Sequence, residues 1–215
     1  MSSPFLSIVI PAHNEATRLP QTLEQVFAFL DGQKYSAEVL VVENGSDDRT
    51  FDLARGFAGG HKNLRVIRET PRGKGLAVRR GMLEAAGEFR FMCDADLSMS
   101  IEQVNNFLPP KLKDIDIAIG SREAAGAVRT NEPSYRHLGG RAINSVIRLL
   151  ILPGLNDTQC GFKCFTAAAA EEIFSRQTLA GWSFDIEVLF IARRLGLTIR
   201  EVPIHWRFDA QTKTV

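Results

Sequence analysis

The feature that most constrains the fold is a regular alternation of short apolar runs with amphipathic segments over the first 120 residues. The apolar runs predict buried strands at 5–10, 38–42, 64–68, 89–93 and 115–120. Apolar residues at helical spacing predict helices between them, at 17–30, 49–57, 75–86 and 101–107. Strands and helices that alternate at this spacing are joined by right-handed crossovers. We therefore predict an α/β fold, with helices on both faces of one largely parallel central sheet.

Beyond Gly120 the pattern is less regular. Residues 121–140 are polar and rich in glycine, and residues 156–166 are predicted to form a loop. Further helices are predicted at 141–152, 167–174 and 184–195, followed by a last strand at 198–206. Because no linker-like stretch divides the chain, we predict one domain over residues 1–215, with a first half up to about residue 120 and a second half from there on.

Composition excludes several classes of protein. With 45% hydrophobic and 24% charged residues, the chain has an ordinary globular composition, and its net charge of +1 gives no reason to expect nucleic-acid binding. It has no apolar run of the roughly 18 residues that a spanning helix needs, and its N-terminus does not resemble a signal peptide. Cys93, Cys160 and Cys164 lack the second cluster of a zinc site. We therefore expect a soluble, cytoplasmic protein with reduced thiols.

Polar side chains collect where the predicted strands end, which is where open parallel sheets bind ligands. Asp94 and Asp96 follow the apolar run 89–93, and such carboxylates suit Mg²⁺ or Mn²⁺, which take further ligands from water and substrate phosphates. Taken alone, two aspartates after a strand are more often a solvated turn. The metal interpretation therefore depends on the surrounding motifs.

Two glycine-containing loops also face this predicted edge. Gly45 permits a positive φ, and Ser46 and Asp48 are good caps for the helix that follows. For Asp48, helix capping and ligand binding are equally good interpretations. Residues 72–75 place two cations and a flexible backbone before a helix N-terminus, which suits an anion, although Lys74 on its own could be a solvated loop lysine.

Taken together, the segments 7–15, 41–50, 73–75 and 94–96 resemble the GT-A glycosyltransferases of family 2. Three later segments, 120–122, 157–165 and 182–187, are similar to the polyprenyl-phosphate glycosyltransferases, and the run from Asp157 to Lys163 is most similar to the dolichyl-phosphate β-glucosyltransferase branch. The resemblance extends from Ser7 to about Trp206. The chain departs from the family at 43–46, which reads Glu-Asn-Gly-Ser where Asp-Asp-Gly-Ser is usual, and at Gly140, where a serine is frequent.

This resemblance implies a Rossmann-like GT-A fold and an inverting, metal-dependent transfer of a hexose to polyprenyl or dolichyl phosphate. Glucose from UDP-glucose is the expected donor group, with Mg²⁺ or Mn²⁺ as cofactor. Two alternatives remain: mannosyl transfer from GDP-mannose, and a non-catalytic nucleotide-sugar-binding subunit of a membrane complex. The departure at Asn44 leaves the nucleobase open, because an amide donates as well as accepts hydrogen bonds.

The resemblance also implies residue roles. Asp96 would bind the metal, and Asp94 would lie towards the ribose and the metal. Asp157 would be a further catalytic carboxylate, although it could also be a loop cap. The remaining nucleotide-sugar contacts would come from Pro11, Ala12, Asn14, Glu15, Glu43, Asn44, Gly45, Ser46, Asp48, Lys74 and Ala95.

On the acceptor side, the resemblance implies that Arg122 and Arg136 bind the lipid phosphate, with Lys163 as a weaker candidate. Trp182 and Asp185 would line the sugar pocket, although core packing and stabilisation of a helix N-terminus are simpler explanations for them. The apolar stripe of the helix at 141–152 is better explained by core packing than by contact with a membrane. A lipid acceptor nevertheless implies a peripheral location at the cytosolic face of a membrane.

Overall fold

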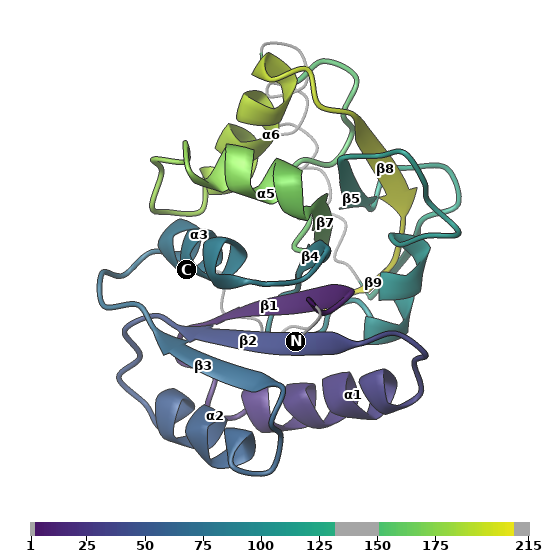
Figure 1. Ribbon diagram of the computed structural model, residues 1–215. Coiled ribbons are helices and arrows are strands. Elements are labelled where there is room, and N and C mark those ends of the chain that lie inside the picture. The colour runs from purple at the N-terminus through teal and green to yellow at the C-terminus, as the bar shows by residue number, and fades with distance from the viewer. Residues whose placement is uncertain (1–2, 132–150, 209–215) are drawn as a thin grey trace.

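The computed structural model describes residues 3–131 and 151–208 (Figure 1). Arg136, Gly140 and all but the end of the helix predicted at 141–152 lie outside these residues. At that end, Ile151 is exposed in a turn and Leu152 is buried. None of the helices within the described residues is long and apolar enough to cross a membrane.

The described residues contain a seven-stranded sheet with the order β3-β2-β1-β4-β7-β5-β8. In that order the strands are Leu64–Arg68, Ala37–Glu43, Leu6–Ala12, Phe89–Met92, Lys163–Thr166, Ile117–Ser121 and Ile199–Pro203. Every neighbouring pair is parallel except the two pairs that involve β7, which is antiparallel to both β4 and β5. This largely parallel sheet confirms the predicted α/β fold.

Helices cover both faces of the sheet (Figure 1). On one face lie α1 (Leu19–Asp31), α2 (Thr50–Ala58) and the 3₁₀ helix η1 (Ile101–Asn106), and on the other lie α3 (Lys74–Glu84), α5 (Ala167–Phe174) and α6 (Phe184–Arg194). The central strand β1 serves both layers, because Ile8 and Ile10 pack into the first cluster and Val9 into the second. A strand that is buried on both faces reads as a continuous apolar run, which is why the sequence predicted it.

Three elements differ from the predictions. β7 lies within the segment 156–166 that was predicted to be a loop; its four residues include a lysine and become a strand only by pairing with β4 and β5. The last predicted strand is split at Ile204 into β8 and β9 (His205–Arg207), and β9 pairs with β6 (Val128–Thr130) in a separate small sheet. The helix predicted at 101–107 is the short η1.

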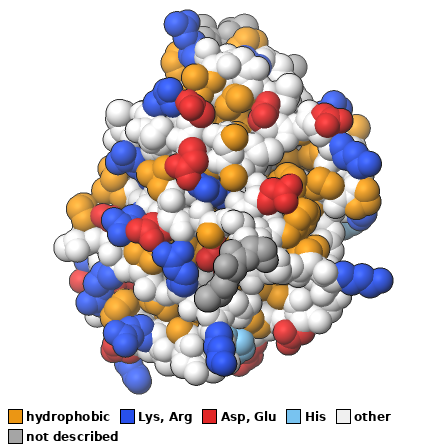
Figure 2. Space-filling view, in the orientation of Figure 1, with side chains coloured by type: hydrophobic (Ala, Val, Ile, Leu, Met, Phe, Trp, Pro, Cys, Tyr) orange, Lys and Arg blue, Asp and Glu red, His pale blue; other side chains and the backbone are white. Residues whose placement is uncertain are grey.

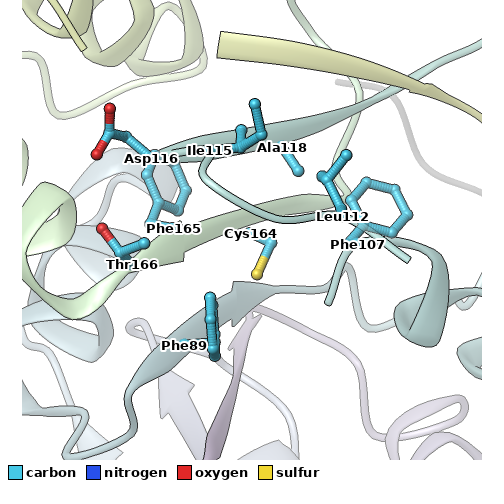
Figure 3. A pocket seen from close by; sticks show the side chains of 9 residues that line it. All are labelled: Phe89, Phe107, Leu112, Ile115, Asp116, Ala118, Cys164, Phe165 and Thr166. Carbon is cyan, nitrogen blue, oxygen red and sulfur yellow. The ribbon is translucent and has the colours of Figure 1, made fainter. Parts of the chain in front are cut away.

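A small cleft of about 10 Å³ lies between β4, β5, β7 and the segment before β5 (Figure 3). Phe89, Asp116 and Thr166 line it at the amino ends of the two parallel strands, and most of its other lining side chains are apolar. Its volume is below the roughly 300–1,000 Å³ of pockets that hold drug-sized ligands. The opposite, carboxyl edge of the sheet is therefore the better place to look for the site.

Candidate active site

The loops after β1 and β2 are joined to each other at the carboxyl edge of the sheet. The Ser46 hydroxyl accepts a hydrogen bond from the Asn14 amide, while the Asn14 side chain accepts one from the Asp47 amide. Asp48 accepts from the amides of Ala16 and Thr50. Burial opposes ionisation of Asp48, but these hydrogen bonds outweigh it and hold the pKa of this carboxyl below its usual value. Asp48 therefore joins the two loops and orders the turn before α2, in line with its capping interpretation.

The side chains of Glu43 and Asn44, at the end of β2, form hydrogen bonds to other groups of the protein. Glu43 accepts hydrogen bonds from the Ser46 amide and from Arg68, and these lower its pKa although burial opposes ionisation. The Asn44 amide group donates to two carbonyls of the 69–73 loop and accepts from the Gly73 amide. In this conformation Asn44 orders the Gly73 loop, and contact with a base would require these hydrogen bonds to be exchanged.

Lys74 and Asp94 form the ion pair at the carboxyl end of β4, with 2.7 Å between Nζ and Oδ1. Burial opposes ionisation of both groups, yet their mutual attraction lowers the pKa of Asp94 and raises the pKa of Lys74. The side chains remain 17% and 28% exposed, respectively, so a ligand can reach the pair. Trp182, itself 57% exposed, covers the ammonium at 4.7 Å.

Glycines permit the close approach that builds this ion pair. A Cβ at Gly161 would overlap the Asp94 carboxylate, and a Cβ at Gly73 or Gly75 would overlap the backbone of residues 179 and 180. The Gly75 amide also donates to the Ala180 carbonyl at 2.8 Å. The glycines therefore allow the loop that carries Trp182 to rest on Lys74.

Ala95 and Asp96 continue from this ion pair into a tight turn. The Thr22 hydroxyl of α1 donates to the Ala95 carbonyl at 2.6 Å, and Asp96 Oδ1 accepts from the Ser98 amide at 3.0 Å. Leu97, which lies between Asp96 and Ser98, has a φ of 44°, a conformation that costs energy for a residue with a side chain. The turn is held from α1 and through its own backbone, which fixes where the Asp96 carboxylate lies.

Glu15 faces the same region. Its carboxylate is bound at both oxygens by Arg18, at 2.7 and 2.8 Å. Burial nevertheless raises the pKa of Glu15 in spite of Arg18, and the charges of Asp96 and Asp94 add to this effect. The three carboxylates thus share one electrostatic environment, so a cation bound there would relieve their repulsion.

Arg122 and Asp157 form the second ion pair, at the end of β5. Two guanidinium nitrogens contact the carboxylate at 2.6 and 2.8 Å, and the Arg122 amide contacts it at 3.0 Å. Asp157 is fully buried, which opposes its ionisation, but Arg122 holds the pKa of this carboxyl below its usual value. Glu201 of β8 accepts hydrogen bonds from the amides of Asn156 and Asp157, and these bonds hold the loop that carries Asp157. Asp157 therefore orients Arg122, and both of its oxygens are occupied.

A third ion pair, Lys163–Asp185, is near enough to the other two for the charge of Lys163 to lower the pKa of both Asp94 and Asp157. Lys163 begins β7 and is fully buried; its ammonium contacts Asp185 at 2.5 Å and the Cys160 carbonyl at 2.6 Å. Burial raises the pKa of Asp185 despite this partner. This placement does not support the prediction that Lys163 binds the acceptor phosphate, because its ammonium is inaccessible. Asp185 is likewise buried, so a role in the sugar pocket would require it to be uncovered.

The residues on the carboxyl edge suit a divalent metal that is shared with a phosphate ligand. Within residues 3–131 and 151–208, no group of three or more His, Cys, Asp or Glu side chains could enclose a metal without outside ligands. Mg²⁺ and Mn²⁺ commonly need only one or two protein carboxylates besides water and phosphate oxygens. Asp96, with Asp94 beside it, provides that number.

The cysteines offer no competing chemistry. All three are free and buried, and burial raises the pKa of Cys93 and Cys164 well above the usual range and that of Cys160 to about 12. A thiol that is protonated and buried is neither a nucleophile nor a metal ligand.

Basic and acidic side chains are interspersed on the face of the molecule shown in Figure 2, so neither positive nor negative charge dominates that face.

Several residues of the site were not predicted from the sequence. Arg18 could have been found from its spacing of three residues from Glu15, and Gly161 from its place within the run 157–163. Thr22 and Glu201 gave no signal, because each acts on backbone that is distant in sequence. The functional roles of the predicted residues stay predictions.

The sequence matches the family described as Glycosyl transferase family 2 over residues 7–174. It is 35% identical to the dolichyl-phosphate beta-glucosyltransferase of Drosophila melanogaster and 34% identical to that of Homo sapiens, with 94% of this chain aligned in each case. The alignments cover 66% and 67% of those proteins, so this chain spans about two thirds of their length.

Solved structures show the same fold. The glucosyl-3-phosphoglycerate synthase of Mycobacterium tuberculosis in complex with UDP superposes with a TM-score of 0.71 at 20% identity, covering 98% of this chain and 74% of that one. The same enzyme with Mn²⁺ and UDP-glucose gives a TM-score of 0.69 over 98% of this chain and 73% of that chain, also at 20% identity. At this identity the likeness establishes the fold alone.

Proposed function

Since this chain belongs to glycosyl transferase family 2, we propose that it transfers glucose from UDP-glucose to the phosphate of dolichyl or another polyprenyl phosphate, with inversion at the anomeric carbon. The observation that carries this proposal is the pair of charged clusters on one edge of the sheet. Lys74–Asp94 lies beyond β4 and Arg122–Asp157 at the end of β5. Each cluster places a cation where a phosphate could bind, one for the donor and one for the acceptor.

The relatives support both substrates. The similar Drosophila and human proteins are named for glucosyl transfer to dolichyl phosphate. The bacterial enzyme with the same fold was crystallised with UDP-glucose and Mn²⁺. Inversion is proposed from the family resemblance.

On the donor side, Asp96 and Asp94 would hold Mg²⁺ or Mn²⁺ against the diphosphate. The metal would supply charge stabilisation to the departing nucleoside diphosphate. Lys74 adds a fixed positive charge beside the same carboxylates. The ordered loops around Asn14 and Ser46 would form the edge on which the base and ribose rest.

On the acceptor side, the attacking phosphate oxygen is already ionised near neutral pH, because the second pKa of a phosphate monoester is about 6. The reaction therefore does not require a strong general base. This agrees with the position of Asp157, whose carboxylate is engaged by Arg122 at both oxygens. We assign Asp157 to the orientation of Arg122 rather than to proton transfer.

A lipid acceptor would place the reaction at a membrane surface, and we propose that the protein acts as a peripheral protein at the cytosolic face. Arg136 and the helix predicted at 141–152 would belong to this acceptor side, but Arg136 and residues 141–150 lie outside the described residues.

The test is a panel of radiolabelled nucleotide sugars incubated with polyprenyl phosphate and Mg²⁺ or Mn²⁺, with the label counted in the organic phase. UDP-glucose should give the lipid-linked product, and EDTA should abolish it. Preferential transfer from GDP-mannose would favour the mannosyltransferase alternative. Binding of UDP-glucose without transfer from any donor would favour the non-catalytic subunit.

A further inference from the structure

Trp206 lies against Arg122, one of the cations of the site. It lies in the short strand β9, and the centre of its ring is 5.5 Å from the Arg122 guanidinium carbon. This is within the range of a cation–π interaction. Because Asp157 binds the same guanidinium at its nitrogens, Arg122 is held both by a carboxylate and by an aromatic face.

The strand that carries Trp206 is fastened to the segment that follows Asp96. Trp206 forms an isolated antiparallel bridge with Met99, and the Arg207 amide donates to the Ser98 carbonyl at 2.8 Å. The Gln103 side chain completes this attachment: it donates to the His205 carbonyl at 2.9 Å and accepts from the His205 amide at 2.7 Å. β9 therefore has hydrogen bonds to the chain between Ser98 and Gln103 along its whole length.

These contacts form a continuous connection between the two sides of the site. Asp96 Oδ1 accepts from the Ser98 amide, the Ser98 carbonyl accepts from β9, and the ring on β9 covers Arg122. The position of Arg122 is therefore set partly by the same turn that sets the position of Asp96. The sequence contains two tryptophans, and each covers one cation of the site: Trp182 covers Lys74, and Trp206 covers Arg122.

We propose that Trp206 is a positioning residue for the acceptor phosphate. Its ring fixes the plane of the Arg122 guanidinium, and its strand fixes the distance of that guanidinium from the Asp96 turn. This inference rests on the proposed function, because it assumes that Arg122 meets the acceptor. It adds the indole ring as the group that presents Arg122 in a binding orientation before the acceptor arrives.

The kinetic test compares Trp206→Leu with Trp206→Phe. Leucine removes the aromatic face, so the KM for polyprenyl phosphate should rise by about three- to ten-fold in Trp206→Leu. Phenylalanine keeps an aromatic face, so this KM should stay close to the wild-type value in Trp206→Phe. The KM for UDP-glucose should change by less than about two-fold in both variants. Phe190→Leu is the matched control, because Phe190 is 46% exposed on α6, outside the site.

A second measurement needs no change at position 206. In a Trp182→Phe background, Trp206 is the only tryptophan of the chain, so its emission reports on the surroundings of Arg122. Titration with a short-chain polyprenyl phosphate should change this emission saturably, and the added mutation Arg122→Ala should abolish the response. Isoprenol without the phosphate is the control and should give no saturable change.

The outcomes separate this inference from the proposed function. A wild-type protein that transfers no glucose contradicts the proposed function, while the fluorescence titration still tests whether phosphate binds beside Trp206. The inference is wrong if Trp206→Leu keeps the wild-type KM for the acceptor. It is also wrong if Trp206→Phe is as impaired as Trp206→Leu, or if the emission of Trp206 does not respond to the phosphate.

Discussion

The donor and acceptor sides of the site are built alike, but their ion pairs differ in burial. Each has a cation paired with an aspartate at the carboxyl end of a strand, and each cation is covered by a tryptophan. On the donor side, Lys74 contacts Asp94 Oδ1 at 2.7 Å, and both side chains are partly exposed. On the acceptor side, Arg122 grips a fully buried Asp157 at both oxygens.

This difference indicates how each side can work. A partly exposed lysine pair can be rearranged by a ligand, because solvent and phosphate oxygens can replace the carboxylate as partners. A buried carboxylate cannot leave its arginine without a large desolvation penalty. The donor side is therefore suited to exchange partners as nucleotide and metal bind, and the acceptor side is suited to stay fixed.

The largest expected effect is on the donor side and concerns catalysis. Asp96→Ala should lower turnover by about a thousand-fold or more, because charge stabilisation by a bound metal contributes several kcal/mol. Asp94→Asn should be less severe. Asp31→Ala, an exposed aspartate at the end of α1, is the control and should keep normal turnover. Full activity of Asp96→Ala, or of the wild type in excess EDTA, would refute the metal assignment.

The next largest effect is on the acceptor side and concerns stability. Asp157→Asn breaks a buried pair, so the free energy of unfolding should fall by about 3 kcal/mol, or roughly 6–12 °C in Tm. Asp94→Asn, in the more exposed pair, should cost less than about 1 kcal/mol. Chemical denaturation of both variants measures this difference directly. Equal losses would mean that the two sides do not differ in rigidity.

A smaller effect should follow from Gly161→Ala, because the added methyl would overlap the Asp94 carboxylate. Displacement of Asp94 from Lys74 should weaken UDP binding by about ten-fold, the loss of roughly one charge-assisted hydrogen bond. Gly56→Ala is the matched control, because no atom lies within 4 Å of a Cβ at that helical position. Calorimetric titration with UDP and Mn²⁺ would detect the difference. Unchanged UDP affinity in Gly161→Ala would show that the position of Asp94 does not matter for the nucleotide.

The smallest effect concerns pH. The pKa of Asp157 is lowered in the folded protein from its ordinary value of 3.8, so its ionised form stabilises the fold above that value. This stability is lost as the pH falls through the lowered pKa. Asp185, whose pKa is raised, acts in the opposite sense, and its contribution is lost as the pH rises. Asp157→Asn should therefore lose less stability than the wild type on acidification below about pH 4, as measured by urea unfolding. A loss as large as that of the wild type would contradict the assignment.

The strands of the donor side could be predicted from the sequence more completely than those of the acceptor side. Strands β1 to β4 are apolar runs that stand next to their partners in a regular βα order, so local pattern was enough to predict them. β7 was missed because its four residues form a strand only between β4 and β5, and β6 was missed because it pairs with the distant β9. The positions of Asp94 and Asp96 were predictable from the strand that precedes them.

The partners of these side chains were less predictable. The sequence suggested Arg122 and Asp157 as separate groups with separate roles, and only the structure joins them. Lys163 looked like an accessible cation in a loop, yet it is fully buried at the start of a central strand. Pairing across the sheet depends on register and on long-range packing, which no local pattern contains.

The division of the site into a donor side and an acceptor side is tested most directly by one variant and two titrations. For Arg122→Ala, the KM for polyprenyl phosphate and the affinity for UDP with Mn²⁺ are measured against the wild type. The loss of a charge-assisted contact should raise the acceptor KM by about ten- to a hundred-fold and leave UDP affinity within about two-fold. Loss of UDP binding with a normal acceptor response would place Arg122 at the donor end and contradict the account.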